Sequence, residues 1–163
     1  MNPPWCSAEP AERELSGRSS VPVAGMPLIR VLIADDHDVV RAGARFILSA
    51  GDVRVYEASN GIEAVRKALE FKPDLVILDL TMPVMGGYAA AKELHRVVPT
   101  IPVLFFSMHH TPKLVEDAKK VGARGFVHKA NATKALLDAV NQLVVHKGTY
   151  FPEPMGSKVP PKL

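Results

Sequence analysis

The strongest constraint on this chain is a strict alternation of short apolar runs with stretches in which apolar residues recur at helical spacing. The pattern repeats five times in about 120 residues. The runs that predict strands are Leu28–Ala34, Val53–Ala58, Leu75–Leu80, Ile101–Phe106 and Gly125–His128. The stretches that follow them place apolar residues three or four positions apart, as an amphipathic helix does. This alternation predicts an α/β domain with a parallel sheet and helices on both faces.

The composition of the five runs sorts them within the sheet. Leu28–Ala34, Leu75–Leu80 and Ile101–Phe106 are almost continuously apolar, so they should be central strands that are covered on both faces. Val53–Ala58 alternates apolar and polar residues and Gly125–His128 is short, so both suit the edges. The prediction is a doubly wound, five-stranded parallel sheet in the order 2-1-3-4-5, the flavodoxin-like arrangement.

Two helices have clear sequence signals. Thr111-Pro112 predicts a helix start with proline at the first position. The most regular amphipathic stripe runs from Ala132 to Val144, with Asn131 or Thr133 available as its N-terminal cap.

Length and composition exclude several classes of protein. The chain has 163 residues, of which 47% are hydrophobic and 23% charged, and this favours one globular domain. Cys6 is the single cysteine, so no intrachain disulfide can form, which suits a reducing compartment. No window reads as a membrane span or a secretory signal, and we expect a cytoplasmic protein. The net charge of +3 is mild and not concentrated, so direct nucleic-acid binding is not expected.

Proline content sets the expected boundaries. Residues 1–26 are broken by four prolines and predict a disordered extension, and Met26 is a candidate biological start. The expected domain covers residues 27–147. Residues 148–163 form a proline-rich tail, too short and too rich in proline for a helix-turn-helix domain.

Acidic residues follow two of the central strands. Asp35-Asp36 ends the first apolar run, and Asp79 lies near the end of the third. In the order 2-1-3-4-5 these strands flank the topological switch point, where open α/β sheets form their ligand crevice. Carboxylates brought together there repel one another, and a hard cation such as Mg²⁺ relieves that repulsion. The carbonyl of Thr81 is available to complete the metal shell, and Asp79 is a candidate oxygen nucleophile.

Two more polar residues follow strands at the same edge. Ser107 comes directly after Ile101–Phe106, and Lys129 after Gly125–His128. A hydroxyl and an ammonium group are suitable partners for phosphoryl oxygens. The crevice therefore favours a phosphoryl ligand.

Residues 28–147 resemble a bacterial response-regulator receiver domain, most closely the receivers of LuxR/NarL-type helix-turn-helix regulators. The matching segments, in order, are Val31-Leu32-Ile33-Ala34-Asp35-Asp36-His37, Asp79-Leu80-Thr81-Met82-Pro83 with Gly86-Gly87, Phe106-Ser107, and Gly125-Phe126-Val127-His128-Lys129. Their order and strand placement agree with the family pattern over about three-quarters of the chain. This is a specific resemblance, because several separate segments match.

The resemblance implies that Asp79 accepts a phosphoryl group from a phosphohistidine on a sensor histidine kinase or phosphotransfer protein. It implies that Asp36, Asp79 and the Thr81 carbonyl hold Mg²⁺, with Asp35 assisting through water. Lys129 and Ser107 would contact the acyl phosphate. Ser107 and Phe126 would form the switch that changes with phosphorylation.

Two positions depart from the common receiver pattern. Ala130 stands after Lys129, where many receivers have a proline in a cis peptide bond, so the loop that carries Lys129 is expected to differ. Met108 follows Ser107, where small residues are frequent, and its larger side chain could restrict access to Asp79.

Each candidate residue also has a structural alternative. Asp35-Asp36 could simply stabilise a helix start, Ser107 could cap the next helix, Phe126 could be ordinary core, and Lys129 a surface lysine. His37 is expected to be a helix-start residue that could also line the crevice. His109-His110 are expected to be loop histidines rather than metal ligands, because no cysteine or acidic cluster accompanies them.

Three functions remain to be separated. The favoured one is a signalling module that is not an enzyme in the ordinary sense, acts on a downstream protein effector, and is compatible with a homodimer. The second is the receiver of a DNA-binding regulator whose output domain is missing from this chain. The third is a haloacid-dehalogenase-like phosphohydrolase, which is disfavoured because the Asp-x-Asp spacing is absent. A Rossmann-type cofactor binder is disfavoured because no G-x-G-x-x-G follows the first strand.

Overall fold

A computed structural model describes residues 28–153 of the chain. Its five strands are all parallel and lie in the order β2-β1-β3-β4-β5, which confirms the predicted arrangement. The strands are β1 Ile29–Ala34, β2 Val53–Ala58, β3 Leu75–Leu78, β4 Val103–Ser107 and β5 Gly125–His128. The expected disordered extension and the candidate start at Met26 lie outside the described residues.

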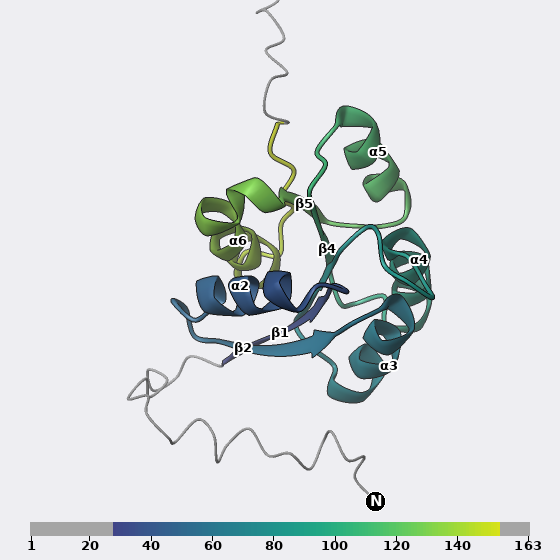
Figure 1. Cartoon of the computed structure of the whole chain (residues 1–163), viewed down its shortest axis with the longest axis horizontal. Coiled ribbons are helices and arrows are strands. Elements are labelled where there is room, and N and C mark those ends of the chain that lie inside the picture. The colour runs from purple at the N-terminus through teal and green to yellow at the C-terminus, as the bar shows by residue number, and fades with distance from the viewer. Residues whose placement is uncertain (1–27, 154–163) are drawn as a thin grey trace, which may run out of the picture.

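Helices cover both faces of the sheet (Figure 1). The helices are α2 Asp38–Leu48, α3 Gly61–Phe71, α4 Gly87–Val97, α5 Pro112–Lys120 and α6 Ala132–Val140. α2 and α6 pack on one face, against side chains such as Val31 and Ile33. α3, α4 and α5 pack on the other face, against Leu32, Leu78 and Phe126. Successive residues of β1 thus belong to opposite cores, as the two-residue period of a strand requires.

Side chains at two helix starts bond to backbone groups that would otherwise lack a partner. The Thr111 side chain accepts a hydrogen bond from the N–H of Leu114, with Pro112 in the first turn, so the predicted start of α5 is confirmed. Asn60 accepts from the N–H of Glu63, and the Glu63 carboxylate accepts from the N–H of Ser59. This reciprocal pair is a capping box that fixes the start of α3.

Several element boundaries differ from those expected. β3 ends at Leu78 because the carbonyl of Leu80 already accepts a hydrogen bond from the N–H of Gly87, outside the sheet. β4 begins only at Val103, since Pro102 before it has no N–H to donate, and it includes Ser107. The last amphipathic stretch is one α-helix that continues as a π-helical turn, Asn141–Val145. Asn131 stands at the N-cap of α6 without a side-chain capping bond.

The chain continues to pack against the domain after Lys147. Tyr150 forms a parallel bridge with Gly125. The N–H of Tyr150 donates to the carbonyl of Arg124 (2.9 Å), and the N–H of Phe126 donates to the carbonyl of Tyr150 (2.8 Å). Phe151 packs on the α3–α5 side, with the Lys119 ammonium 4.7 Å from its ring centroid. The outer edge of β5 is therefore covered by a short extra segment.

No helix among residues 28–153 is both long enough and apolar enough to cross a lipid bilayer.

Candidate functional site

The acidic residues predicted at the strand ends lie side by side in the structure. Asp35 follows β1 and Asp79 follows β3, and these two strands are neighbours in the sheet. The N–H of Asp79 donates to the carbonyl of Ala34 (2.9 Å), which keeps the two chain segments paired up to the carboxylates. Asp35 is fully buried and Asp79 is 7% exposed. The sheet itself thus forces two carboxylates into one poorly solvated position.

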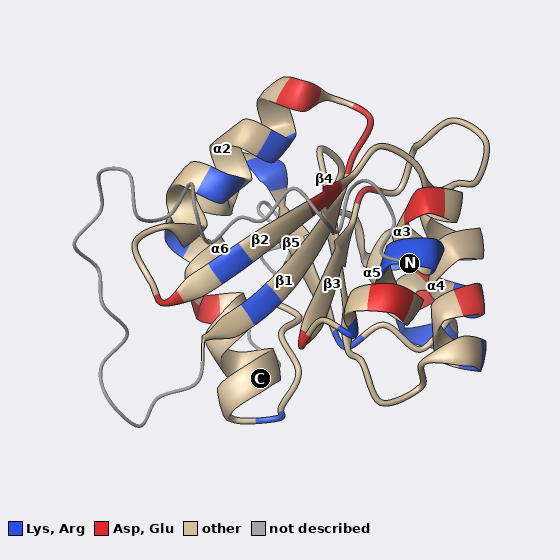
Figure 2. Ribbon diagram, turned by 90° about the horizontal axis from the view of Figure 1, so that it is seen from below, with Lys and Arg blue, Asp and Glu red and all other residues tan. Residues whose placement is uncertain are grey.

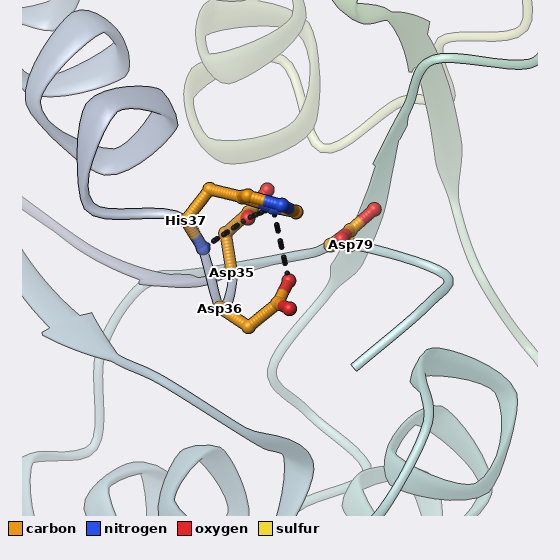
Figure 3. A group of neighbouring side chains, drawn as sticks. All are labelled: Asp35, Asp36, His37 and Asp79. Carbon is orange, nitrogen blue, oxygen red and sulfur yellow. Dashed lines mark hydrogen bonds and ion pairs between the residues drawn. The ribbon is translucent and has the colours of Figure 1, made fainter. Parts of the chain in front are cut away.

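Asp36 and His37 complete a group of four potential metal ligands. One ligand atom from each of Asp35, Asp36, His37 and Asp79 can be chosen so that all lie within 4.8 Å of one another. His37 Nδ1 lies 3.2 Å from Asp35 Oδ1 and 3.1 Å from Asp36 Oδ1, as the dashed lines in Figure 3 mark. His37 is also the N-cap residue of α2. Both expectations for His37, a helix start and a residue lining the crevice, describe its position.

The turn between β1 and α2 is held in place by a network of its own. The N–H of His37 donates to Asp35 Oδ1 (2.9 Å), and the Arg41 guanidinium donates to the carbonyl of Asp35 (2.6 Å). Arg41 also pairs with Asp38 and with Glu57. Figure 2 shows the acidic turn at the start of α2 and the basic residues along that helix. These bonds fix the direction in which Asp35 and Asp36 present their carboxylates.

Lys129 lies between two of the carboxylates. Its Nζ is 2.6 Å from Asp35 Oδ2 and 3.3 Å from Asp79 Oδ1, and its side chain is only 8% exposed. The Phe106 ring lies below the ammonium, with 5.7 Å between Nζ and the ring centroid. Lys129 begins a short 3₁₀ turn, Lys129–Asn131, and no peptide bond among residues 28–153 is cis. Because the Lys129 ammonium lies close to both Asp35 and Asp79, it partly neutralises the acidic group.

One positive charge does not balance the site. Burial raises the pKa of the Asp79 carboxyl, and the negative charge of Asp35 raises it further, while Lys129 acts in the opposite direction. The net shift is upward. The ionised form of Asp79 is therefore short of positive charge, which an added cation would supply.

Close backbone packing places the loop after β3 beside the site. A Cβ atom on Gly87 would lie 2.2 Å from the carbonyl oxygen of Asp79, so only glycine allows α4 to begin there. The N–H of Gly87 donates to the carbonyl of Leu80 (2.9 Å). Thr81, whose carbonyl was predicted to complete the metal shell, is exposed in this loop. Gly87 thus positions the loop after β3.

The two predicted switch residues lie on neighbouring strands, Ser107 at the end of β4 and Phe126 near the start of β5. Ser107 is 3% exposed, and its Oγ accepts a hydrogen bond from the N–H of His109 (3.1 Å). Phe126 is fully buried, and its ring packs against Phe105 with 6.3 Å between the centroids. Met108 is 61% exposed, and its carbonyl lies 2.6 Å from His128 Nε2.

His110 was expected to be an unremarkable loop residue, yet it stacks on Phe126. The ring centroids are 5.0 Å apart and the planes differ by 17°. Burial lowers the pKa of the His110 imidazole, and the nearby His128 lowers it further. Sequence spacing carries no signal for this contact, because it depends on how the loop after β4 folds back over β5.

Comparison with known proteins agrees with this architecture. The Response regulator receiver domain family matches residues 31–141. The transcriptional activator protein ExaE of Pseudomonas putida is 34% identical over 131 residues, which cover 79% of this chain and 61% of that protein. The response regulator protein VraR of Staphylococcus aureus is 35% identical over 127 residues, which cover 77% of this chain and 61% of that protein. The chain thus spans about three-fifths of the length of these relatives.

A solved structure extends the likeness to three dimensions. The two-component response regulator of the LuxR family from Aurantimonas sp. superposes with a TM-score of 0.71 and 30% sequence identity, covering 76% of this chain and 89% of that one. The chain therefore belongs to the response-regulator receiver domain family and is similar to the receivers of LuxR-type regulators.

Proposed function

We propose that this protein accepts a phosphoryl group on Asp79 from a phosphohistidine of a sensor kinase or phosphotransfer protein, and passes the signal to a protein partner. The observation that carries the proposal is the Asp79 carboxylate, 3.3 Å from the Lys129 ammonium and beside Asp35 and Asp36. A nucleophilic oxygen, a fixed cation and a set of oxygen ligands are the groups that phosphoryl transfer needs. If Asp35 and Asp36 served only to stabilise a helix start, a buried lysine that bridges the ends of two strands would not be required.

The donor set suits a hard divalent cation. Asp36, Asp79 and the Thr81 carbonyl would hold Mg²⁺, with Asp35 assisting through water because both of its carboxylate oxygens already accept hydrogen bonds from the protein. The raised pKa of Asp79 fits a site that lacks positive charge. Bound there, Mg²⁺ would offset negative charge on the phosphoryl oxygens.

The reaction uses few groups of the chain. An Asp79 carboxylate oxygen attacks phosphorus, the phosphorus–nitrogen bond to the donor imidazole breaks, and the imidazole leaves with the electron pair of that bond. Lys129 bonds to a phosphoryl oxygen and opposes the charge that develops on it. Ser107 Oγ would exchange its bond from His109 for a contact with the phosphoryl group. Later attack by water would release inorganic phosphate and restore the Asp79 carboxylate.

The signal is a shift between two arrangements of the β4–β5 side of the site. A phosphoryl group can favour one arrangement only through contacts that differ between the two. Ser107 and Phe126 are the residues that we assign to this change. Phe126 is suited to it because its ring contacts both Phe105 and His110.

A second candidate function is regulation of transcription. ExaE is a transcriptional activator and VraR a response regulator, and each is longer than the part that this chain matches. In that case the receiver chemistry would control a DNA-binding domain rather than a separate effector. Both candidates require phosphorylation of Asp79, so that step is tested first.

The experiment is incubation of the full chain with Mg²⁺ and phosphoramidate, followed by intact-mass spectrometry. The wild type should gain the mass of one phosphoryl group, and hydroxylamine should remove it, because an acyl phosphate is labile to that nucleophile. Asp79→Asn should gain none. Asp52→Asn, which alters an exposed aspartate in a turn before β2, should behave as wild type.

Two results would contradict the proposal. The first is a phosphoryl adduct of equal yield on Asp79→Asn. The second is steady phosphate release from many unrelated esters without a stable adduct, which would favour the phosphohydrolase.

A further inference from the structure

A cavity of about 560 Å³ lies at the edge of the sheet opposite the acidic crevice. Its walls come from the connections that lead into β3, β4 and β5 and from the π-helical turn that ends the last helix. In a parallel sheet all strand starts lie at one edge, whereas Asp35 and Asp79 follow strand ends at the other. Pockets of about 300–1,000 Å³ hold small organic ligands. The cavity is therefore large enough for a ligand that does not contact the acidic crevice.

Positive charge predominates among the described residues that line the cavity. Lys72, Arg124 and Lys147 are the cations, and Asp74 is the only carboxylate among those residues. None of the three cations forms an ion pair with a carboxylate of residues 28–153. The Asp74 carboxylate already accepts a hydrogen bond from the backbone N–H of Arg30 (2.8 Å). The lining thus has an excess of two positive charges.

The backbone at the two lysines is unusual. Lys72 ends α3 with a φ of 47°, and Lys147 has a φ of 52°, in the left-handed region that favours glycine. A lysine at a helix end often bonds to the last carbonyl groups, but at α3 the Arg30 guanidinium bonds to the carbonyls of Phe71 (2.8 Å) and Lys72 (2.7 Å). Capping therefore does not account for Lys72. Two strained lysines that line one cavity point to a use for their side chains.

Arg124 is held in place by three hydrogen bonds. Its N–H donates to the carbonyl of Val103 (2.9 Å), and its carbonyl accepts from the N–H of Tyr150 (2.9 Å). Its guanidinium donates to the carbonyl of Lys147 (2.7 Å). A guanidinium carries five N–H donors, so most of them remain available to a ligand, and their planar arrangement suits the oxygens of a phosphate.

The rest of the lining is largely apolar. Ile101 belongs to the core on the α3–α5 side of the sheet and Leu143 to the core on the α2–α6 side, so the cavity lies between the two cores. The connecting loops are restricted by three prolines, Pro73, Pro99 and Pro102. Stiff loops lower the ordering cost of binding, and apolar walls favour a ligand with an uncharged body.

We propose that this cavity binds a small organic phosphate of about nucleotide size, with the phosphate on Lys72, Arg124 and Lys147 and the uncharged body against the apolar wall. A phosphate monoester carries about 1.5–2 negative charges at pH 7, which matches the excess of positive charge. A single carboxylate would leave part of that excess unpaired. The inference goes beyond the proposed function and does not depend on it, because the cavity and the acidic crevice lie at opposite edges of the sheet.

The test is calorimetric titration of the full chain with AMP, with inorganic phosphate and with adenosine. EDTA is present so that no metal in the acidic crevice attracts the phosphate. AMP should bind about tenfold more tightly than either fragment, because it alone uses both the cations and the apolar wall. Added NaCl should weaken AMP binding, since the contacts are between charges.

Two variants remove the cations one at a time. Arg124→Gln keeps an amide that can donate to the Lys147 carbonyl and should weaken AMP binding by about tenfold. Lys72→Asn suits the left-handed backbone and should weaken it by about threefold, because Lys72 is exposed. Lys134→Gln, an exposed position on α6 outside the cavity, loses the same charge and should bind AMP as wild type does. Circular dichroism of all three variants should match the wild type.

Amide NMR of the wild type locates the ligand. AMP should shift the signals of Ile101, Arg124 and Leu143 and leave those of Asp36 and Asp79 unchanged. Shifts confined to Asp36 and Asp79 would place AMP in the acidic crevice and overturn the proposal.

Three further results would overturn it. The first is no AMP binding at millimolar concentrations. The second is equal affinity in the wild type and Arg124→Gln. The third is binding of a glutamate-rich peptide without binding of AMP, which would identify a protein-docking surface instead.

Discussion

The two sides of the site are built from different forces. The carboxylate side consists of the exposed Asp36 and of Asp35, Asp79 and Lys129, which are poorly solvated and held by ion pairs. The aromatic side, formed by Phe105, Phe126 and His110, is held by ring packing. Removing one partner of a buried ion pair strongly lowers the free energy of unfolding, whereas replacing a packed ring by a smaller apolar side chain lowers it less. We therefore expect phosphoryl transfer to depend on the carboxylate side, and the conformational response to depend on the aromatic side.

The largest expected effect comes from removing the cation of the carboxylate side. Lys129→Met leaves Asp35 and Asp79 without their shared partner, and breaking such a buried pair costs about 3–5 kcal/mol. Urea unfolding of the metal-free protein measures this loss. Added Mg²⁺ should restore more stability in the variant than in the wild type, since no ammonium competes for Asp79. A loss below about 1 kcal/mol would mean that the pair is effectively solvated.

Lys113→Met is the matched control for that variant. Lys113 pairs with Asp117 one helical turn away, and its side chain is 81% exposed. Exposed pairs of this kind contribute about 0.3–0.5 kcal/mol. A cost similar to that of Lys129→Met would remove the distinction between buried and surface pairs on which the comparison depends.

A smaller effect is expected on the aromatic side. Phe126→Leu keeps an apolar side chain but loses both ring contacts, at a cost of about 1–2 kcal/mol in the free energy of unfolding. The dissociation constant for Mg²⁺ should not change. The pKa of His110, now lowered by burial and by His128, should rise towards its ordinary value of 6.5 as the ring becomes more solvated. An NMR titration of the histidine ring protons measures that rise.

Phe106→Leu provides the contrast within the same sheet. Phe106 is also buried, but it packs on the opposite face and lies beneath Lys129. Its replacement should cost a similar free energy of unfolding and leave the pKa of His110 where it is. A shift of the His110 pKa in Phe106→Leu, or a changed Mg²⁺ affinity in Phe126→Leu, would show that the two sides are not separable.

The smallest expected change is a gain of stability in Asp79→Asn. Burial and the charge of Asp35 raise the pKa of Asp79 in the folded state, so above that pKa the ionised carboxylate destabilises the metal-free protein. The variant should therefore unfold at higher urea concentration at neutral pH. Its advantage should shrink as the pH falls through the raised pKa towards 3.8, because the wild type then becomes neutral as well. An advantage independent of pH would point to a packing effect instead.

Much of the fold could be predicted from the sequence because strand burial leaves a direct mark on composition. The continuous apolar runs occupy β1, β3 and β4, and the alternating run occupies the edge strand β2. The close approach of Asp35 to Asp79 follows from the same rule, since parallel neighbours end at one edge of a sheet. The strand limits at Leu78 and Val103 were less predictable, because hydrogen bonding in the adjoining loops decides them.

Contacts made by loops had no comparable sequence signal. The stacking of His110 on Phe126 and the pairing of Tyr150 with β5 depend on chain reversals that no periodicity records. The segment from residue 148 onwards is rich in proline. Proline content argues against a helix there, but it does not exclude a single β-bridge such as that of Tyr150. The salt bridge from Lys129 to Asp35 was also unforeseen, because spacing places both residues in the crevice but does not rank the possible partners.

The bridge at Tyr150 has a mechanical consequence. One hydrogen bond joins its carbonyl to the very residue, Phe126, whose ring we assign to the response. A domain joined to the chain after Tyr150 would be anchored to β5 by this hydrogen bond rather than to the last helix. A rearrangement at Phe126 would then change this hydrogen bond directly. An attached domain could respond to phosphorylation without contacting the crevice.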